Sequence, residues 1–425
     1  MALAQAKADL TDARLDGLTV PNGAGWASEA RADALARVRT MGLPTRRDEY
    51  WKYTNPAALT AVDAATIGDA AEAEAVFGAT DALRIVFVDG AFDADASDSL
   101  VADGVEIETL GSALTADIHW ARDVFGALES KGQMPVDRPL AALNTASTTE
   151  GMVIRATGKV AKPVLIEYRQ TSGAADAMIH HVVKIDADAD LTVLETGTAG
   201  ARVNTVMEVD VADSAAFHHV RTQGRDHDRA VATHCFARVA AEATFKSFTL
   251  TANGTLTRNE CVIDIVGDNA VAHVAGACVG DGRDFHHDDT VFITHDAVNC
   301  ESRQVFKKVL RNGATGVFQG KILVKEGAQK TDGYQISQSL LLDDDSQFLA
   351  KPELEIYADD VACSHGSTSG AIDETALFYL RSRGVRHADA ISLLTLAFLA
   401  EALEEMEDEA LSEAIRDRLE IWLAR

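Results

Sequence analysis

Residues 244–270 read TFKSFTLTANGTLTRNECVIDIVGDNA and hold two β-rich runs, FKSFTL and CVIDIV, each followed by turn formers. Aromatic and β-branched side chains favour strands, whereas Asn253-Gly254 and Gly267-Asp268-Asn269 are typical of turns. From about Gly151 the same alternation continues for roughly 200 residues, with no amphipathic window long enough for a helix. The middle of the chain is therefore predicted to be all β.

The spacing of these runs indicates a repeating coil. Alternate strand centres are separated by about 25–29 residues, which is near the period of a solenoid with two long strands per turn. Two consecutive β-sandwiches would place strands at similar intervals, so both architectures stay open at this point. The centres that define the spacing are Ile154, Val183, Glu208, Cys235, Val262, Val291 and Gln319.

The N-terminal part, residues 1–145, is predicted to be helical and mixed. Ala, Leu and charged residues dominate its first turns, and Ser28 is predicted to cap a helix over 29–41 that ends at Gly42. Two β-branched runs follow, LRIVFVDG and VEIETL, and then a predicted helix over 117–131.

Residues 363–425 are predicted to form a C-terminal helical domain after a β core over 146–362. Asp373 is expected to cap a helix through ETALFYLRSR, with Gly384 just beyond its end. A second helix is expected over 387–405. For the third helix and the FYL segment, apolar stripes fit core packing and partner docking equally well. The stripe of the third helix is Leu411, Ile415, Leu419 and Trp422.

The composition indicates which partners and which cellular compartment to expect. The chain has 39 Lys+Arg against 66 Asp+Glu, a formal net charge of −27, so nucleic acid and anionic membrane surfaces are not expected as partners. Acidic residues interrupt the N-terminal stretch, and no apolar run is long enough for a secretory leader or a membrane span. Five widely spaced cysteines without a CxxC pair fit reduced thiols, and a cytoplasmic location is expected.

The sharpest chemical feature is Cys363 with His365, in the segment EIYADDVACSHGSTSG over 355–370. If this segment is extended, the two side chains lie on one face of the strand. A thiolate beside an imidazole suits iron, zinc or copper(I). Two ligands do not complete a tetrahedral site, so a metal here would need further ligands, plausibly from a second chain. The competing interpretation is a packed cysteine and a histidine in a turn.

Other motifs are incomplete. GSTSG has Thr368 where a nucleophile elbow needs serine. GATGVFQGKI resembles a phosphate loop but has Thr315 at the first glycine position and Ile322 where Ser or Thr is needed. His286-His287-Asp288-Asp289 alternates across a strand, so satisfied or solvent-facing histidines are expected there. ATP or dinucleotide binding by this chain alone is not expected.

The block from 318 to 385 resembles the SufB/SufD family of iron–sulfur cluster assembly proteins. It reads FQGKILVKEGAQKTDGYQISQSLLL and then KPELEIYADDVACSHGSTSGAIDETALFYLRSRGV, and the motif DDVACSHG is closer to SufD than to SufB. RRDEYWKYTN at 46–55 and PLAALNTAS at 139–147 match the family as well. The nearest departure is Ser367-Thr368-Ser369, where SufD proteins more often have Ala-Thr-Val.

The resemblance implies a right-handed parallel β-helix flanked by N-terminal and C-terminal helical domains. It also implies a scaffold rather than an enzyme, which pairs with SufB and binds the ATPase SufC through its C-terminal helices. The nascent cluster would form at the SufB–SufD interface, with His365 as this chain's contribution and Cys363 beside it. No intrinsic cofactor is implied, and the sequence locates no site for the reduced flavin associated with such complexes. SufC would dock near Leu377, Phe378, Tyr379 and Arg383.

Two other hypotheses stay open on the sequence. One is a β-helix carbohydrate-active enzyme that uses carboxylates in a groove. The other is a metal-binding scaffold that acts as a homodimer without a distinct partner.

Overall fold

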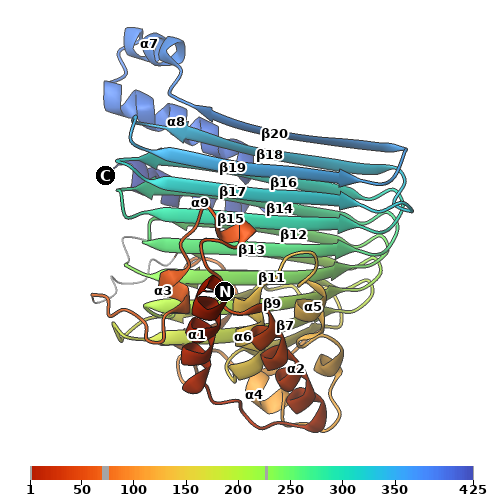
Figure 1. Cartoon of the computed structure of the whole chain (residues 1–425). Coiled ribbons are helices and arrows are strands. Elements are labelled where there is room, and N and C mark those ends of the chain that lie inside the picture. The colour runs from red at the N-terminus through yellow and green to blue at the C-terminus, as the bar shows by residue number, and fades with distance from the viewer. Residues whose placement is uncertain (1, 69–75, 225–227, 425) are drawn as a thin grey trace.

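The computed structural model describes residues 2–68, 76–224 and 228–424, and its centre is a stack of β-coils (Figure 1). Successive strands alternate between two ten-stranded sheets, A and B, and inner neighbours in each sheet are parallel. The chain thus forms a parallel β-solenoid of about seven turns. Because sandwiches are antiparallel, the alternative of two sandwiches is wrong.

The residue ranges of the two sheets follow. Sheet A contains β1 (Leu83–Val88), β2 (Ala91–Asp93), β6 (Val164–Arg169), β8 (Asp190–Gly197), β10 (Ala216–Gln223), β12 (Thr244–Ala252), β14 (Val271–Asp281), β16 (Glu301–Arg311), β18 (Thr331–Leu341) and β20 (Val361–Gly370). Sheet B contains β3 (Val101–Ala102), β4 (Val105–Thr109), β5 (Met152–Ala156), β7 (Asp176–Ile185), β9 (Arg202–Val211), β11 (Ala230–Val239), β13 (Leu256–Ile265), β15 (His286–His295), β17 (Thr315–Val324) and β19 (Gln347–Ile356).

The strand spacing predicted from sequence is confirmed. Ile154 and Val183 are direct register partners, and the other predicted centres fall on successive strands of sheet B. Side chains stacked on neighbouring coils are 26 to 31 residues apart. Strands begin before the predicted core, since β1 to β4 extend both sheets, and they continue past Cys363 to Gly370.

One corner of the solenoid repeats a left-handed residue from coil to coil. Asn269 and Asn299 have φ of +60° and +59°, a conformation that asparagine tolerates better than most residues. Their side chains also stack, with Asn299 Nδ2 donating to Asn269 Oδ1 at 2.7 Å. This corner turns the chain out of sheet B and into sheet A once per coil. The same conformation recurs at Asp188, Ser214, Glu242 and Lys330.

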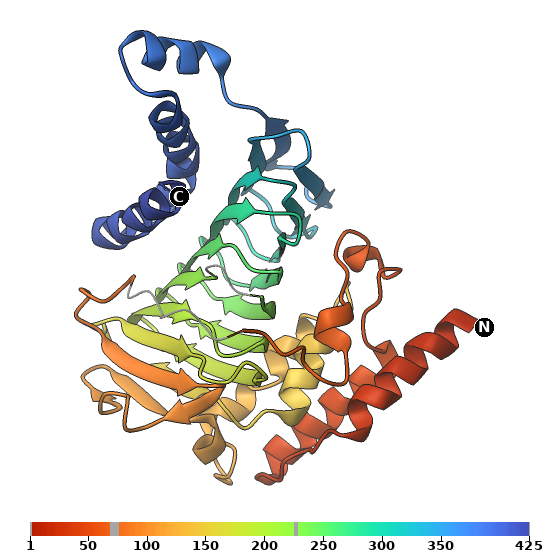
Figure 2. The ribbon, with the colours of Figure 1, turned by 90° about the vertical axis from the view of Figure 1, so that its left-hand side faces the viewer.

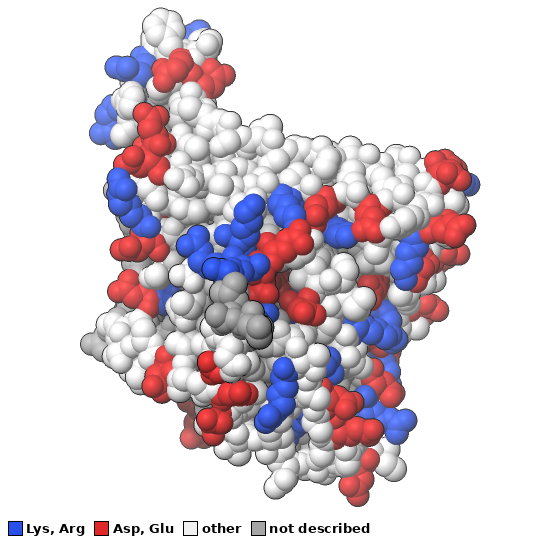
Figure 3. Space-filling view, viewed as in Figure 1, with Lys and Arg blue, Asp and Glu red and all other residues white. Residues whose placement is uncertain are grey.

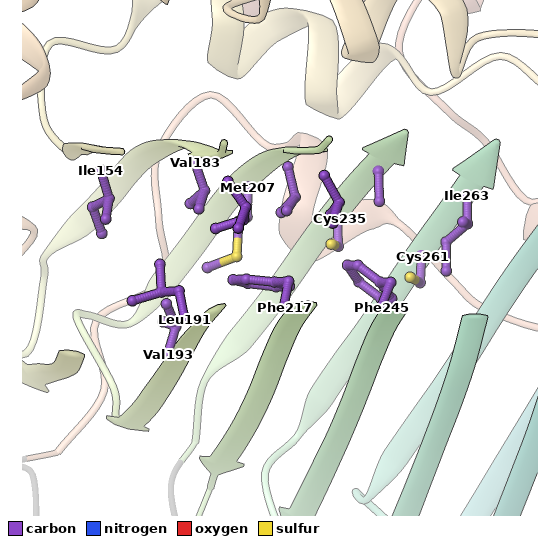
Figure 4. Close-up of a cluster of buried hydrophobic side chains, with 14 of the residues drawn as sticks. Ile154, Val183, Leu191, Val193, Met207, Phe217, Cys235, Phe245, Cys261 and Ile263 are labelled. Carbon is purple, nitrogen blue, oxygen red and sulfur yellow. The ribbon is translucent and has the colours of Figure 1, made fainter. Parts of the chain in front are cut away.

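The core lies between the sheets, where inward side chains from both meet. Figure 4 shows Phe217 and Phe245 from sheet A pointing toward Cys235 and Cys261 from sheet B. Inward residues alternate with outward ones along each strand, as the strand period requires. Cys235 and Cys261 lie in this core, and each is less than 9% exposed.

The N-terminal helices cover the outer face of sheet B at the low-numbered end of the stack (Figure 2). Helix α2 runs Gly25–Met41, so the prediction that Ser28 caps it is wrong; the Ser28 hydroxyl donates to the carbonyl of Gly23 instead. The prediction of a single helix over 117–131 is also wrong, because Gly126, at φ +70°, separates two short helical pieces. The elements here are α1 (Ala2–Asp16), α2, η1 (Glu49–Trp51), α3 (Ala57–Thr60), α4 (Leu110–Ala113), η2 (Trp120–Asp123), α5 (Ala127–Lys131) and α6 (Pro139–Ser147).

The C-terminal helices are α7 (Glu374–Ser382), α8 (His387–Leu403) and α9 (Glu409–Leu423). Asp373 caps α7 and Gly384 follows it at φ +89°, as predicted. Helices α8 and α9 pack on the outer face of sheet A, and the predicted apolar stripe of α9 is buried there. The stripe therefore packs against the core. No helix in the described ranges is long and apolar enough to cross a membrane.

A row of basic side chains on sheet A holds the turn between α8 and α9. Lys246, His273 and Arg303 are register neighbours on β12, β14 and β16. Glu405 lies 3.2 Å from His273 Nδ1 and 3.8 Å from Arg303, and Glu407 pairs with Lys246. These contacts fix the C-terminal helices in position against β12, β14 and β16.

Buried histidines should make the fold acid-sensitive. Burial lowers the pKa of His181 and of His295 from 6.5 to about 4. Between these values the unfolded chain binds a proton that the folded chain does not, so stability falls as pH falls from about 6.5 to 4, by up to about 3 kcal/mol per histidine. Urea unfolding across this range should show a shallower pH slope for His295→Gln than for wild type. The exposed control Ser364→Gln, which removes no group that titrates in this range, should keep the wild-type slope.

Candidate functional site

The candidate site is the end of the stack, where β20 is the last strand of sheet A. It pairs with β18 on one side and has no strand on the other among the described residues. Its ten residues, VACSHGSTSG, contain no charge and no proline. Exposed edge strands normally carry charged residues or proline, because an open edge is otherwise a template for another strand. Figure 3 shows little charge along the upper margin of this face, over β20.

Strand β19, the last of sheet B, is different. It carries Lys351, Pro352 and Glu353 in its middle. Proline and charged residues are typical protection for an edge strand. Lys351 also pairs with Glu49 at 2.8 Å, which ties this strand to the N-terminal part. The unprotected edge thus belongs to β20.

Cys363 and His365 lie on the same face of β20, as expected for an extended segment. Cys363 packs beside Ile322 and Val361, so this face points between the two sheets. His365 is the register partner of Gln335 on β18 and is exposed, because no further coil lies above it in the described chain. The imidazole therefore stands at the surface of the open end, whereas the thiol is half-buried.

A polar layer supports this end of the interior. Gln335 Nε2 donates to Gln304 Oε1 at 2.8 Å, one coil below. Ser367 and Ser369 on β20 bond to Ser337 and Ser339 on β18, each pair at 2.8 Å. These contacts add to the backbone ladder that holds β20 in register with β18. His365 thus lies on a regular strand above a polar layer.

Cys363 and His365 could supply two ligands to a metal ion. No group of three His, Cys, Asp or Glu side chains arranged for a metal occurs in the described parts of the chain. A tetrahedral iron or zinc centre needs four ligands. An iron ion held by His365 and Cys363 would therefore need ligands beyond the described residues, and the open edge of β20 is where a second chain could bring them.

Cys363 should be the reactive thiol of this protein. Cys235, Cys261, Cys278 and Cys300 are buried, and Cys363 is half-buried. Partial burial raises the pKa of Cys363, so its alkylation rate should keep rising with pH beyond about 9. Under native conditions iodoacetamide should modify Cys363 first, as read by mass spectrometry. Cys363→Ala should remove this fast phase and Cys235→Ala should not; a fast phase that persists in Cys363→Ala would contradict the assignment.

The other sequence motifs have structural roles. His287 and Asp289 contact Lys308 Nζ, at 2.8 and 2.5 Å, and form a buried charge cluster. The histidines there are thus satisfied by hydrogen bonds, which was one of the two expectations. The segment resembling a phosphate loop lies within β17, and GSTSG lies within β20, so neither forms the loop or elbow that its chemistry would need.

Helix α7 follows β20 after residues 371–373 and stands away from the stack (Figure 1). Of the residues predicted to dock a partner, Phe378 and Tyr379 are 74% and 57% exposed. Arg383 lies over the Tyr379 ring, 5.1 Å from its centre. Leu377 is buried and so is no part of the open surface. An exposed aromatic and arginine patch of this kind is typical of interface anchors.

Sequence reasoning missed a charged cluster inside the solenoid. Glu195 on β8 accepts hydrogen bonds from Tyr168 at 2.6 Å, His219 at 2.7 Å and Arg221 at 2.7 Å. All four side chains are buried. The alternation of side chains along β8 could have placed Glu195 on the inward face, but its hydrogen-bond partners come from neighbouring coils. Only the stacking register brings them together.

Comparison with known proteins agrees with this architecture. A family model described as "SUF system FeS cluster assembly, SufBD core domain" matches residues 168–398. The chain is 28% identical over 404 residues to iron–sulfur cluster assembly protein SufD of Escherichia coli, covering 91% of this chain and 90% of that protein. It is 27% identical over 419 residues to a SufBD family protein of Synechocystis, covering 91% and 88%. The resemblance inferred from the C-terminal motifs is thereby confirmed, and this chain belongs to the SufBD family of the SUF iron–sulfur cluster assembly system.

Proposed function

We propose that this protein is a SufD-like scaffold subunit that pairs with a SufB-type chain at the edge of β20. The observation that carries the proposal is an uncharged strand whose outer edge has no partner among the described residues and which carries Cys363 and His365 side by side. A partner strand would satisfy the open backbone groups of β20. The same partner would bring the remaining ligands to His365. The nascent iron–sulfur cluster is the cargo of this interface and not a resident cofactor.

His365 is the better ligand of the pair. Its imidazole is exposed at the open end, whereas the Cys363 thiol is partly covered and its pKa is raised by burial. A neutral imidazole binds iron without first losing a proton, but a thiol must be deprotonated to bind. Cys363 thus acts in a supporting position, and the sulfur-accepting cysteine belongs to the partner.

The second partner in this proposal is a SufC-type ATPase that docks on α7. Phe378, Tyr379 and Arg383 form the exposed patch, and Leu377 fixes the helix from beneath. Helix α7 is connected to β20 by only three residues, 371–373. Movement of α7 on nucleotide hydrolysis would therefore reach the cluster site through a short connection. In this proposal the chain works in the cytoplasm and hydrolyses nothing itself.

The test is anaerobic co-expression with SufB and SufC partners. His365→Ala should lower cluster absorbance at least about tenfold while the complex still purifies intact. Cys363→Ala should lower it less. His387→Ala, an exposed histidine on α8, is the matched control and should behave like wild type. Full cluster yield in His365→Ala would remove this residue from the site, and absence of any complex in wild type would overturn the scaffold proposal.

A second copy of this chain is the alternative occupant of the β20 edge. An open strand accepts an identical strand as readily as a related one. Sedimentation of the chain expressed alone distinguishes a dimer from a monomer, and added SufB-type partner should displace the second copy. The carbohydrate-enzyme hypothesis gains no support, because the chain belongs to an assembly family.

A further inference from the structure

A small cavity lies inside the solenoid at the ends of β8 and β10, facing β9 and β11 across the interior. It leaves about 30 Å³ of room for the centres of water-sized groups, enough for one small ion and its contacts. Its lining is mostly polar and includes several threonines. The residues that matter here are Glu195, Thr198, Arg221, Gln223, Arg229 and Thr233.

Most of the charge around this cavity is already neutralised. Arg221 pairs with Glu195, with Nε at 2.7 Å from Oε2, and its third nitrogen donates to Thr233 at 3.0 Å. Desolvation by burial lowers the pKa of His219, which favours the neutral imidazole. The Glu195–Arg221 pair therefore contributes no net charge to the cavity.

Arg229 is the exception. Its side chain is 1% exposed, and neither terminal nitrogen of its guanidinium has a hydrogen-bond partner in the described parts of the chain. A buried guanidinium without a counter-charge is strongly unfavourable. Burial lowers the pKa of Arg229 to about 10, which still leaves it cationic at neutral pH. The lining of the cavity thus carries one positive charge that no protein group balances among the described residues.

Two glycines keep the space in which this guanidinium lies. A Cβ on Gly224 would clash with the carbonyl oxygens of Ala252 and Asn253 at 2.5 Å and would approach one terminal nitrogen of Arg229 to 2.7 Å. A Cβ on Gly254 would approach the other terminal nitrogen to 3.1 Å. Both have positive φ, +80° and +116°. The hydroxyl of Thr257 lies beside Gly254 and is also buried without a partner among the described residues. Two unsatisfied donors therefore meet at one place.

We propose that Arg229 and its cavity form a binding site for one small monovalent anion of the size of chloride or bromide. One negative charge balances the guanidinium, whereas a divalent oxyanion would overcompensate it. Tetrahedral oxyanions are also too large for this volume. The anion would stabilise the middle coils by pairing the Arg229 charge, independently of the cluster site on β20.

Bromide is the probe for this site. Crystals of the full chain grown in sodium bromide should show an anomalous peak within hydrogen-bond distance of the Arg229 guanidinium. In solution, the urea midpoint should rise with bromide concentration relative to sodium gluconate at equal ionic strength, because an ion that binds only the folded state stabilises it. Gluconate is too large to enter.

Two variants separate anion binding from a general loss of stability. Arg229→Met should lose the bromide-dependent rise, and Arg229→Lys should keep part of it. Arg31→Met is the matched control, because Arg31 is equally buried but donates to the carbonyls of Pro21 and Thr148. It should lower stability and keep the bromide effect. A protein carboxylate or a water beside the Arg229 guanidinium, at the place expected for bromide, would overturn the proposal. A bromide effect that is retained in Arg229→Met would also overturn it.

Discussion

Replacing Arg221 with methionine is expected to lower the free energy of unfolding by about 3–5 kcal/mol. The substitution leaves Glu195 buried inside the solenoid without its cationic partner. Burial alone would raise the pKa of Glu195, but Arg221 and the hydrogen bond from His219 hold it well below its ordinary value. Without Arg221 the carboxyl either remains charged at a high energy or takes up a proton. Both outcomes weaken the folded state at neutral pH.

The pH dependence gives this prediction a second readout. A carboxyl whose folded pKa is depressed contributes stability above its unfolded pKa, about 4, and loses that contribution as pH falls. In Arg221→Met the contribution is absent already at neutral pH, so urea midpoints of the variant and wild type should converge toward acid. A constant difference across the range would contradict the charge argument.

Two control variants complete the measurement. Arg221→Met combined with Glu195→Gln should recover most of the loss, because removing both charges of a buried pair is often nearly neutral. Arg238→Met removes an arginine that is paired with Asp210 but partly exposed, and it should cost no more than about 1 kcal/mol. If the single Arg221 variant loses no more than Arg238→Met, the interior cluster is not a stabilising element.

The repeating coil could be predicted because its signals are local. Each strand is an alternating run, and each corner carries a residue that tolerates left-handed backbone, as at Asn269 and Asn299. Such signals recur once per coil. A period measured between alternate strands therefore assigns those strands to one sheet. The first residues of helices were harder to predict, since α2 begins at Gly25 without any side-chain cap.

The interior chemistry could not be predicted because it depends on register between coils. Gln304 and Gln335 bond to each other although they are 31 residues apart, and a shift of one residue would turn one of them outward. The same holds for Glu195 and Arg221. The motif at Cys363 and His365 was visible in the sequence, but the open edge beside it follows from where the stack ends. Sequence also gave no reason to separate the buried Leu377 from the exposed Phe378.

Adding lysines at Ser364 and Thr368 is expected to weaken the proposed pairing with a SufB-type partner strongly. Both side chains are exposed and lie on the face of β20 opposite to His365. The isolated chain should therefore keep its thermal midpoint. Lysines along a sheet edge prevent another strand from approaching, since pairing would bury their charges. Affinity measured by titration calorimetry should fall at least tenfold, which is about 1.4 kcal/mol or more.

The matched control adds the same two charges elsewhere. Gln5→Lys with Ala13→Lys places them on exposed positions of α1, and this variant should bind the partner as wild type does. Undiminished binding by the Ser364 and Thr368 variant would show that the partner docks away from β20. Comparison with His365→Ala then separates two roles of the strand. Loss of His365 should remove the cluster from an intact complex, whereas lysines on the edge should remove the complex and, with it, the cluster.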